Sequence, residues 1–199
     1  MRQALVYIHG KGGNPREAEH YKRLFSDWEV LGFDYSAQNP WEALQEFQTF
    51  FAELVGQYDS IRLVAVSIGA YFALYALAKQ PIEKAYLISP IVDMERLIKD
   101  MMAWTGVTED ELQSKVVIPT EFGDDLSWEY LFYVRKHPIQ ITFPALILYG
   151  EKDALVSYET ISAFAERWDV PLTIMKGGEH WFHTKEQMAF LDQWIRENR

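Results

Sequence analysis

The sequence predicts one α/β domain in which six strands form a mainly parallel sheet with helices on both faces. Short apolar runs alternate with helical patterns along the 199 residues, and strands joined through helices in this way form right-handed parallel units. The length suits one domain with a sizeable core, and no repeat or flexible linker divides the chain. The expected strands are residues 4–8, 28–34, 61–66, 84–89, 145–150 and 172–175.

Local signals mark the helices that join these strands. The stretches "NPRE" at 14–17 and "NPWE" at 39–42 each place Asn at the N-cap, Pro at the first helical position and Glu at the third. The third strand runs directly into a serine and then into an apolar helical stretch. The helices of the regular part are expected from about 15, from about 40, over 68–79, near 158–168 and from about 184.

The alternation breaks after the fourth strand, where residues 90–142 indicate two or three helices. Thr108 and Ser127 are typical N-cap residues, and His137, which precedes a proline, ends the last helix. An insertion at this point usually lies over the carboxyl ends of the strands, where open α/β sheets bind ligands. We therefore expect a single domain over 1–199 with a helical cap insertion over 90–142. Most of its aromatic residues should pack the cap on the core, and one or two should line a pocket: Trp104, Trp128, Tyr130, Phe132 and Tyr133.

Composition narrows the classes of function. The 29 acidic and 19 basic residues give a formal net charge of −10, which disfavours nucleic-acid binding because such surfaces are usually basic. The chain has no cysteine, which excludes a disulfide, a thiolate metal site and a cysteine nucleophile. The apolar run at residues 4–8 is too short for a signal sequence or a membrane span, which favours a cytoplasmic enzyme without a membrane partner.

A polar serine interrupts the most apolar region of the chain. Ser67 lies where the third strand must turn abruptly into a helix, and the small residues Ala65 and Gly69 allow the neighbouring backbone to approach closely. Such a turn lifts the hydroxyl above the sheet, and the Ile68 amide can donate to an oxyanion beside it. The alternative is a serine that only caps the helix.

A serine nucleophile needs a base that is itself oriented by an acid. Asp153 follows the fifth strand and His180 follows the sixth, so both are expected at the edge of the sheet where Ser67 lies. The chain order Ser, Asp, His is the order typical of this architecture.

Two details of this assignment have alternatives. Asp93 follows the fourth strand and could supply the acid, but it also suits the N-cap of the first insertion helix. His183 lies close to His180, which is favoured because a Gly-Gly turn precedes it. A zinc pair is not expected because no third ligand cluster accompanies these histidines. His20 and His137 are expected to be surface or packing residues.

The glycine-rich loop "HGKGG" at 9–13 follows the first strand. Its glycines allow the backbone to curl so that an amide, best that of Lys11, joins the Ile68 amide in an oxyanion hole. A phosphate-binding turn is the alternative, but the spacing matches neither a dinucleotide fingerprint nor a P-loop.

Together these motifs resemble the α/β-hydrolase family, in particular its compact serine hydrolases of the intracellular or carboxylesterase type. The likeness spans nearly the whole chain, although Ala65 replaces the first Gly of the family's G-x-S-x-G pattern and the family's first two antiparallel strands are missing. It implies the α/β-hydrolase fold with strand order 2-1-3-4-5-6. It also implies roles for five residues: Ser67 as nucleophile, His180 as base, Asp153 as acid, and the amides of Lys11 and Ile68 as oxyanion hole.

The resemblance implies hydrolysis of a carboxylic ester of a small to medium substrate, without a metal or an organic cofactor. The same triad serves thioesterases, lactonases, amidases, C–C hydrolases and acyltransferases, so these remain alternatives. A non-catalytic ligand-binding protein on the same fold is a further alternative, which the complete triad argues against. Lys11 and Arg135 would favour an anionic substrate.

Overall fold

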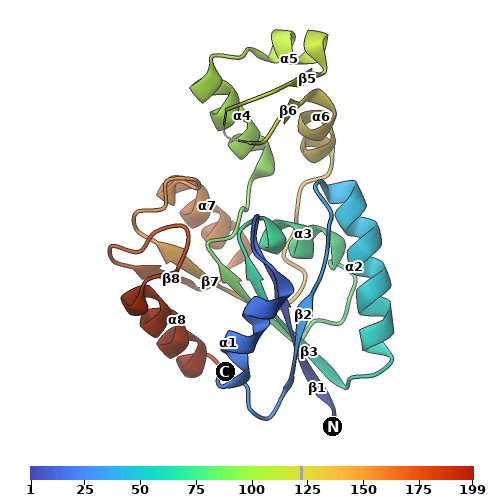
Figure 1. Ribbon diagram of the computed structural model, residues 1–199, viewed down its shortest axis with the longest axis vertical. Coiled ribbons are helices and arrows are strands. Elements are labelled where there is room, and N and C mark those ends of the chain that lie inside the picture. The colour runs from blue at the N-terminus through green and yellow to red at the C-terminus, as the bar shows by residue number, and fades with distance from the viewer. Residues whose placement is uncertain (122) are drawn as a thin grey trace. The chain divides into compact units, whose positions relative to one another are not determined.

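The computed structural model describes residues 1–121 and 123–199 (Figure 1). The chain forms two compact units. The larger unit consists of residues 1–92 and 140–199, and the smaller unit consists of residues 93–139. The smaller unit thus lies within the stretch where the sequence predicts an insertion.

A six-stranded parallel sheet forms the centre of the larger unit (Figure 1). The register aligns Ile8 with both Phe33 and Ala65, so the carboxyl ends of neighbouring strands meet at one edge. The spatial order of the strands is β2-β1-β3-β4-β7-β8. It confirms the order 2-1-3-4-5-6 that the resemblance implies, because β5 and β6 belong to the smaller unit and the fifth and sixth strands of this sheet are therefore labelled β7 and β8. The strands are β1 Gln3–Ile8, β2 Glu29–Phe33, β3 Ser60–Val66, β4 Lys84–Ile88, β7 Ala145–Gly150 and β8 Leu172–Met175.

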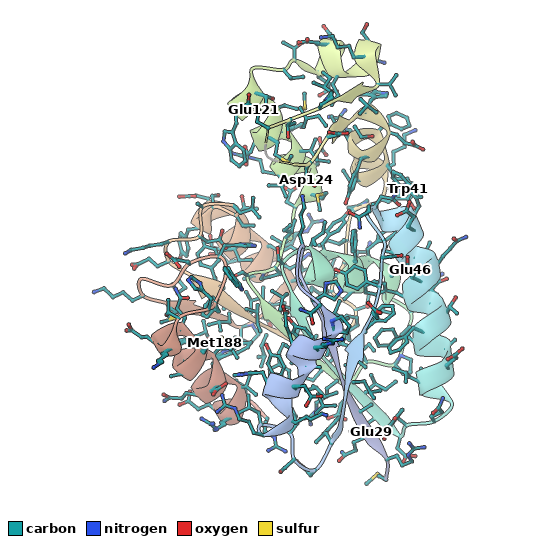
Figure 2. All side chains as sticks on the ribbon, viewed as in Figure 1. Glu29, Trp41, Glu46, Glu121, Asp124 and Met188 are labelled. Atoms are coloured by element: carbon teal, nitrogen blue, oxygen red, sulfur yellow. The ribbon has the colours of Figure 1, made fainter. Side chains whose placement is uncertain are left out.

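Helices cover both faces of this sheet. Asn14, Asn39 and Thr184 cap their helices with side-chain oxygens, which satisfy backbone amides that lack a partner within the helix. Figure 2 places Glu46 on α2 and Met188 on α8, two helices on opposite faces. The helical elements are η1 Pro15–Ala18, α1 Glu19–Lys22, α2 Pro40–Val55, α3 Ile68–Ala76, α7 Tyr158–Trp168 and α8 Lys185–Glu197.

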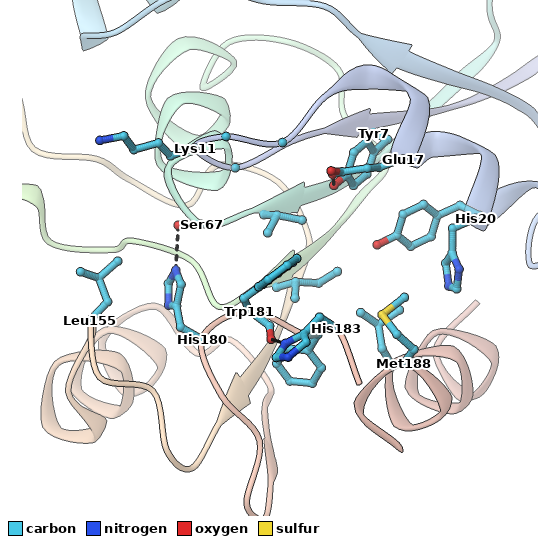
Figure 3. A pocket seen from close by; sticks show the side chains of 18 residues that line it. Tyr7, Lys11, Glu17, His20, Ser67, Leu155, His180, Trp181, His183 and Met188 are labelled. Atoms are coloured by element: carbon cyan, nitrogen blue, oxygen red, sulfur yellow. Dashed lines mark hydrogen bonds between the residues drawn. The ribbon is translucent and has the colours of Figure 1, made fainter. Parts of the chain in front are cut away.

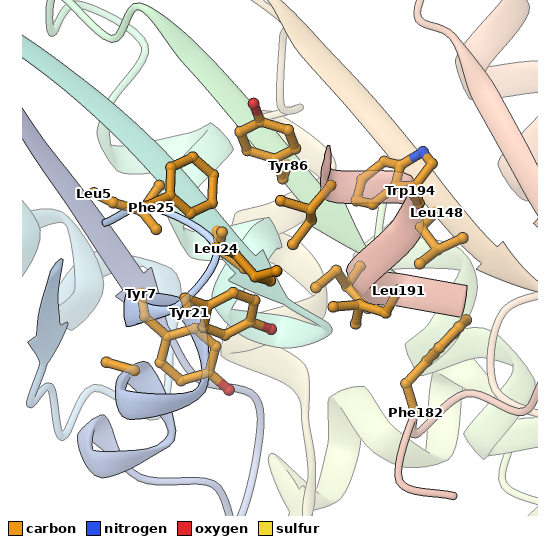
Figure 4. Close-up of a cluster of buried hydrophobic side chains, with 14 of the residues drawn as sticks. Leu5, Tyr7, Tyr21, Leu24, Phe25, Tyr86, Leu148, Phe182, Leu191 and Trp194 are labelled. Carbon is orange, nitrogen blue, oxygen red and sulfur yellow. The ribbon is translucent and has the colours of Figure 1, made fainter. Parts of the chain in front are cut away.

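Alternate residues of each strand supply the two halves of the core. Leu5 and Tyr7 of β1 pack with α1 and α8 in a buried cluster that also holds Phe25, Tyr86 and Trp194 (Figure 4). The ring centroids of Tyr86 lie 5.8 Å from those of both Phe25 and Trp194, in edge-to-face geometry. Fully burying one such side chain contributes about 1.5–3 kcal/mol, so this cluster anchors α1 and α8 to the sheet.

A second aromatic cluster packs α2 and α3 against the other face. Phe47 of α2 lies edge-to-face against Phe33, Tyr35 and Phe72, at centroid distances of 4.8, 5.3 and 6.3 Å. Phe47 and Phe51 are fully buried. This packing holds the loop after β2 close to the start of α3.

Two helix predictions differ from the structure. The helix expected from about 15 is a 3-10 turn followed by one short α-helix, and the backbone of this turn approaches β2 very closely. A Cβ at Gly32 would lie 2.0 Å from the Pro15 carbonyl oxygen, so this close packing of the turn on β2 requires glycine there. The helix expected over 68–79 ends at Ala76, because the chain enters a turn closed by the Gln80 amide and the Leu77 carbonyl, 2.9 Å apart.

Among its described residues, 93–121 and 123–139, the smaller unit has three helices and a two-stranded antiparallel sheet. Thr108 and Ser127 accept the hydrogen bonds of N-caps, as the sequence predicts. Arg135, which the sequence suggested as a contact for an anionic substrate, forms ion pairs with Glu95 and Glu109 within this unit. Its positive charge is therefore balanced by these two carboxylates. The elements of the smaller unit are α4 Met94–Thr105, α5 Glu109–Lys115, β5 Val117–Ile118, β6 Leu126–Ser127 and α6 Trp128–Lys136. The two-stranded sheet was not predicted because two-residue strands carry no periodicity.

Within residues 1–121 and 123–199, no helix is both long and apolar enough to span a membrane.

Candidate active site

Ser67 lies in a strained turn between β3 and α3. Its φ of 51° and ψ of −121° are rare for a residue with a side chain, and such backbone costs on the order of 1–3 kcal/mol. Backbone hydrogen bonds hold the turn. The Ser67 amide donates to Ile88 (3.0 Å), and its carbonyl accepts from Ala70 (3.1 Å), Tyr71 (3.4 Å) and Ile91 (3.2 Å). These bonds therefore hold the end of β3 against the last residue of β4 and the segment that follows it.

The Ser67 side chain does not cap α3. No capping hydrogen bond forms from its hydroxyl, so the alternative interpretation of Ser67 as a helix cap is wrong. The Oγ atom lies instead 2.9 Å from Nε2 of His180 (Figure 3). The Ser67 residue is 9% exposed, so its hydroxyl is partly shielded from water.

Asp153 orients His180 from the other side of the imidazole ring. Its Oδ2 atom lies 2.7 Å from His180 Nδ1, and its Oδ1 accepts hydrogen bonds from the amides of Leu155 (2.8 Å) and Val156 (2.9 Å). The Asp153 side chain is fully buried, so these bonds replace its hydration. A carboxylate in this position accepts a hydrogen bond from the Nδ1–H group, which keeps the proton on Nδ1 and leaves Nε2 as the acceptor that faces Ser67.

The Asp153 and His180 loops are joined by close backbone contacts. A Cβ at Gly150 would lie 2.5 Å from the Glu179 carbonyl oxygen, so the end of β7 can touch the His180 loop only because it is glycine. The Lys152 amide donates to Gly178 (2.7 Å), and the Gly177 amide donates to the Glu151 carboxylate (2.8 Å). These contacts hold the loop of Asp153 next to the loop of His180.

Tyr149 of β7 forms a hydrogen bond to the loop that carries Asp153. Its hydroxyl donates to the Val156 carbonyl at 2.8 Å. Burial, with the nearby Asp153 charge, raises the pKa of Tyr149 to about 12, so the phenol keeps the proton that this bond needs.

The glycine-rich loop after β1 lies beside the serine turn. A Cβ at Gly69 would lie 2.2 Å from the His9 carbonyl oxygen, and a Cβ at Gly10 would lie 3.2 Å from Ser67 Cβ. Tyr35 donates to that same His9 oxygen (2.7 Å) and stacks on the His9 ring at a centroid distance of 4.4 Å. The Lys11 segment and the start of α3 at Ile68, which the sequence predicts as the two oxyanion donors, therefore flank Ser67.

A cavity of about 680 Å³ opens at Ser67 and His180. Its lining residues all belong to the larger unit, and they include the 10–13 loop and Leu155 near the serine and Met188 of α8 (Figure 3). A volume in this range is typical of sites that bind small to medium ligands. That aromatic residues of the smaller unit also line a pocket stays a prediction.

The alternative site residues make other contacts. Asp93 caps α4, where its Oδ1 accepts from the Arg96 amide at 2.9 Å. His183 lines the cavity, but its Nδ1 donates to the Trp181 carbonyl (2.8 Å) and its ring stacks on Trp181. In the described part of the chain, no three His, Asp or Glu side chains are grouped so that they could hold a metal ion.

Sequence reasoning missed a group of residues at the same cavity. His20, interpreted from the sequence as a surface or packing residue, lines the cavity, and its Nε2 lies 2.7 Å from the buried carboxylate of Asp192. Tyr7, Glu17 and Tyr21 line the same region. His20 and Asp192 are 172 positions apart, and no local pattern relates them.

Comparisons with known proteins agree with this fold. The model of an uncharacterised protein family, UPF0227, matches residues 4–192. Among solved structures, Est1E from Butyrivibrio proteoclasticus is 16% identical with a TM-score of 0.71, covering 99% of this chain and 86% of that chain. Alpha/beta hydrolase domain-containing protein 10 from mouse is 18% identical with a TM-score of 0.74, covering 98% and 88%.

An esterase from Exiguobacterium antarcticum is 16% identical with a TM-score of 0.62, covering 98% of this chain and 92% of that chain. No curated protein matches the chain significantly in sequence. At these identities the structural matches establish the fold, and the chain has the α/β-hydrolase fold.

Proposed function

The chain belongs to the uncharacterised protein family UPF0227, and we propose that it is a serine hydrolase that cleaves carboxylic esters of small to medium size. One observation carries the proposal, which is the continuous hydrogen-bonded series from Ser67 through His180 to the buried Asp153, at 2.9 and 2.7 Å. A structural serine has no need for a base positioned in this way. The likeness of the fold to known esterases adds support.

In the proposed mechanism, Ser67 Oγ attacks the ester carbonyl while His180 Nε2 takes its proton. Asp153 holds the productive tautomer and stabilises the imidazolium that forms. The amides of Lys11 and Ile68 donate to the oxyanion of the tetrahedral intermediate, and losing one such donor typically costs about 3 kcal/mol. The alcohol leaves with the proton from His180, and a water molecule then releases the acyl group by the same route.

The proposal is tested with p-nitrophenyl esters from acetate to decanoate and with a fluorophosphonate that labels activated serines. We expect turnover with an optimum at one chain length and a single phosphonate on the peptide that contains Ser67. A matched thioester series decides between ester and thioester substrates. Neither turnover nor labelling at Ser67 would contradict a serine hydrolase and would favour a ligand-binding role.

Replacement of Gly69 by alanine should disturb the proposed oxyanion hole. The new Cβ would lie 2.2 Å from the His9 oxygen, so the 9–13 loop must move away from Ser67. We expect a loss of about 1–3 kcal/mol in unfolding free energy and a decrease of roughly 100-fold in the rate of phosphonate labelling. Thermal unfolding and labelling kinetics measure the two effects.

Gly56→Ala is the matched control for this variant. Gly56 has a φ of −78°, and the nearest atom to an added Cβ lies 3.8 Å away, so both quantities should stay close to those of the unmodified protein. If Gly69→Ala behaves like Gly56→Ala, the close approach of the two loops is not needed for reactivity.

A further inference from the structure

One part of the active-site cavity carries polar groups that the proposed mechanism does not use. Tyr7, Glu17, His20 and Tyr21 line it from β1, η1 and α1. In Figure 3 the labelled members of this group lie on the opposite side of the pocket from Leu155. Because they line the same cavity as Ser67, a molecule that reaches the serine can also place a group against them.

The hydroxyl of Tyr21 is available to a ligand. Tyr21 is 4% exposed and lines the cavity, and within residues 1–121 and 123–199 its hydroxyl makes no hydrogen bond. Its ring stacks on Tyr7 at a centroid distance of 5.2 Å (Figure 4). The Tyr7 hydroxyl donates to Glu17 Oε2 at 2.5 Å. A buried hydroxyl without a protein partner needs one from the cavity, because leaving such a group unpaired is costly.

The charge at this end of the cavity is negative. Among the described residues Glu17 forms no ion pair, and its carboxylate accepts hydrogen bonds from Tyr7 and, at 3.5 Å, from Asn14. The side chain of Lys11 points away from Glu17 (Figure 3). The other nearby carboxylate, Asp192, is already neutralised by Arg23 and bonded to His20.

The nearby negative charge contributes to raised pKa values of both phenols. Burial raises the pKa of Tyr21, and the carboxylates of Glu17 and Asp192 raise it further. Burial also raises the pKa of Tyr7, with added contributions from Tyr21 and Glu17. Both phenols therefore stay neutral, and their oxygens can accept a hydrogen bond from a cation.

We propose that this end of the cavity, formed by Tyr7, Glu17 and Tyr21, binds a protonated amine of the substrate. The inference rests on the proposed function, because it names the substrates as esters that carry an alkylammonium group. The ammonium would pair with the Glu17 carboxylate, donate to the Tyr21 oxygen and contact the stacked aromatic rings. An anionic group would meet an unpaired carboxylate there and would be disfavoured.

Binding without turnover tests this subsite independently of the reaction. The Ser67→Ala protein is titrated calorimetrically with n-hexylammonium, 1-hexanol and hexanoate, which share one chain length and differ in charge. We expect n-hexylammonium to bind about tenfold more tightly than 1-hexanol, and hexanoate to bind most weakly. Equal affinities for the three ligands, tighter binding of hexanoate, or no binding of n-hexylammonium would each overturn the proposal.

Substitutions at the subsite assign the preference to its residues. In the same background, Glu17→Gln keeps an acceptor for Tyr7 and removes the charge, so the preference for n-hexylammonium over 1-hexanol should disappear. Tyr21→Phe should weaken n-hexylammonium binding several-fold with less effect on 1-hexanol. Glu19→Gln is the matched control, because Glu19 is an exposed carboxylate that pairs with Lys22, and it should leave the preference intact. A preference that survives Glu17→Gln would overturn the assignment.

The failure of the subsite and the failure of the proposed hydrolysis give different results. Phosphonate labelling at Ser67 with no preference for the ammonium ion would leave a serine hydrolase without this subsite. An ammonium preference that depends on Glu17, without any labelling, would support the subsite and contradict the hydrolase. With both intact, p-nitrophenyl 6-aminohexanoate should be cleaved with about tenfold higher kcat/KM than its neutral isostere, the heptanoate.

Discussion

Replacement of Ser67 by alanine is expected to reduce ester turnover to the background rate, a loss on the order of 10⁶-fold in kcat by comparison with serine nucleophiles of known triads. The substitution removes the only atom of this residue that can form an acyl-enzyme, while the backbone bonds of the turn to Ile88, Ala70 and Ile91 remain. Losing the hydrogen bond to His180 should cost about 1 kcal/mol in stability. Initial rates with the best p-nitrophenyl ester, together with thermal unfolding, measure both effects.

Ser114→Ala provides the matched control for this experiment. Ser114 is an exposed serine on α5 of the smaller unit, and its replacement should leave turnover and unfolding temperature nearly unchanged. If Ser67→Ala keeps turnover within tenfold of the unmodified protein, another group attacks the ester and the proposed mechanism is wrong.

Much of the larger unit could be predicted from the sequence because its signals are local. The strands at 145–150 and 172–175 are short apolar runs that each follow a proline and end before a charged residue, and the structure has them with these bounds. Asn39 with the following proline starts α2 where expected, because the cap and the fixed φ of proline act within one turn. The 3-10 turn at 15–18 escaped prediction because its start signal, a capping Asn followed by Pro, is the same as that of an α-helix.

The candidate site was predictable in part for a topological reason. Parallel strands bring their carboxyl ends to one edge, so Ser67, Asp153 and His180 could be placed together before any distance was known. The choice of Asp153 over Asp93 could not be settled in this way, because both follow strands of the same sheet. The contacts that separate them involve the amides of Leu155 and Val156, whose positions depend on the folded loop.

The polar end of the cavity had no signal in the sequence. Tyr7 has the pattern of a buried strand residue, and Glu17 has the pattern of a residue in the first turn of a helix; both descriptions are correct. Their meeting with Tyr21 depends on how η1 packs against β1 and β2 and how α1 packs against β2, which is a property of the tertiary structure. Sequence patterns report the backbone each residue prefers, and they leave open which side chains share a cavity.

Replacement of Asp153 by asparagine is expected to lower kcat by about 10⁴-fold while the fold is kept. The amides of Leu155 and Val156 both donate to Oδ1, so the asparagine carbonyl oxygen should occupy that position and its NH₂ group should face His180. An NH₂ group donates to Nδ1, which moves the imidazole proton to Nε2. His180 would then present an N–H to Ser67 and could not take its proton. The ester assay measures kcat, and thermal unfolding checks the fold.

Asp93→Asn is the matched control, and it also tests the alternative acid. Asparagine caps helices as well as aspartate does, so α4 should keep its hydrogen bond from the Arg96 amide to residue 93. Because Asp93 caps α4 and Asp153 contacts His180, we expect Asp93→Asn to keep kcat within about twofold of the unmodified protein and to change the unfolding free energy by less than about 0.5 kcal/mol. The reverse result, with kcat lost in Asp93→Asn and kept in Asp153→Asn, would transfer the acid role to the loop after β4. That outcome would require the loop to rearrange, because in the structure the His180 ring is already paired on both nitrogens, with Ser67 and with Asp153.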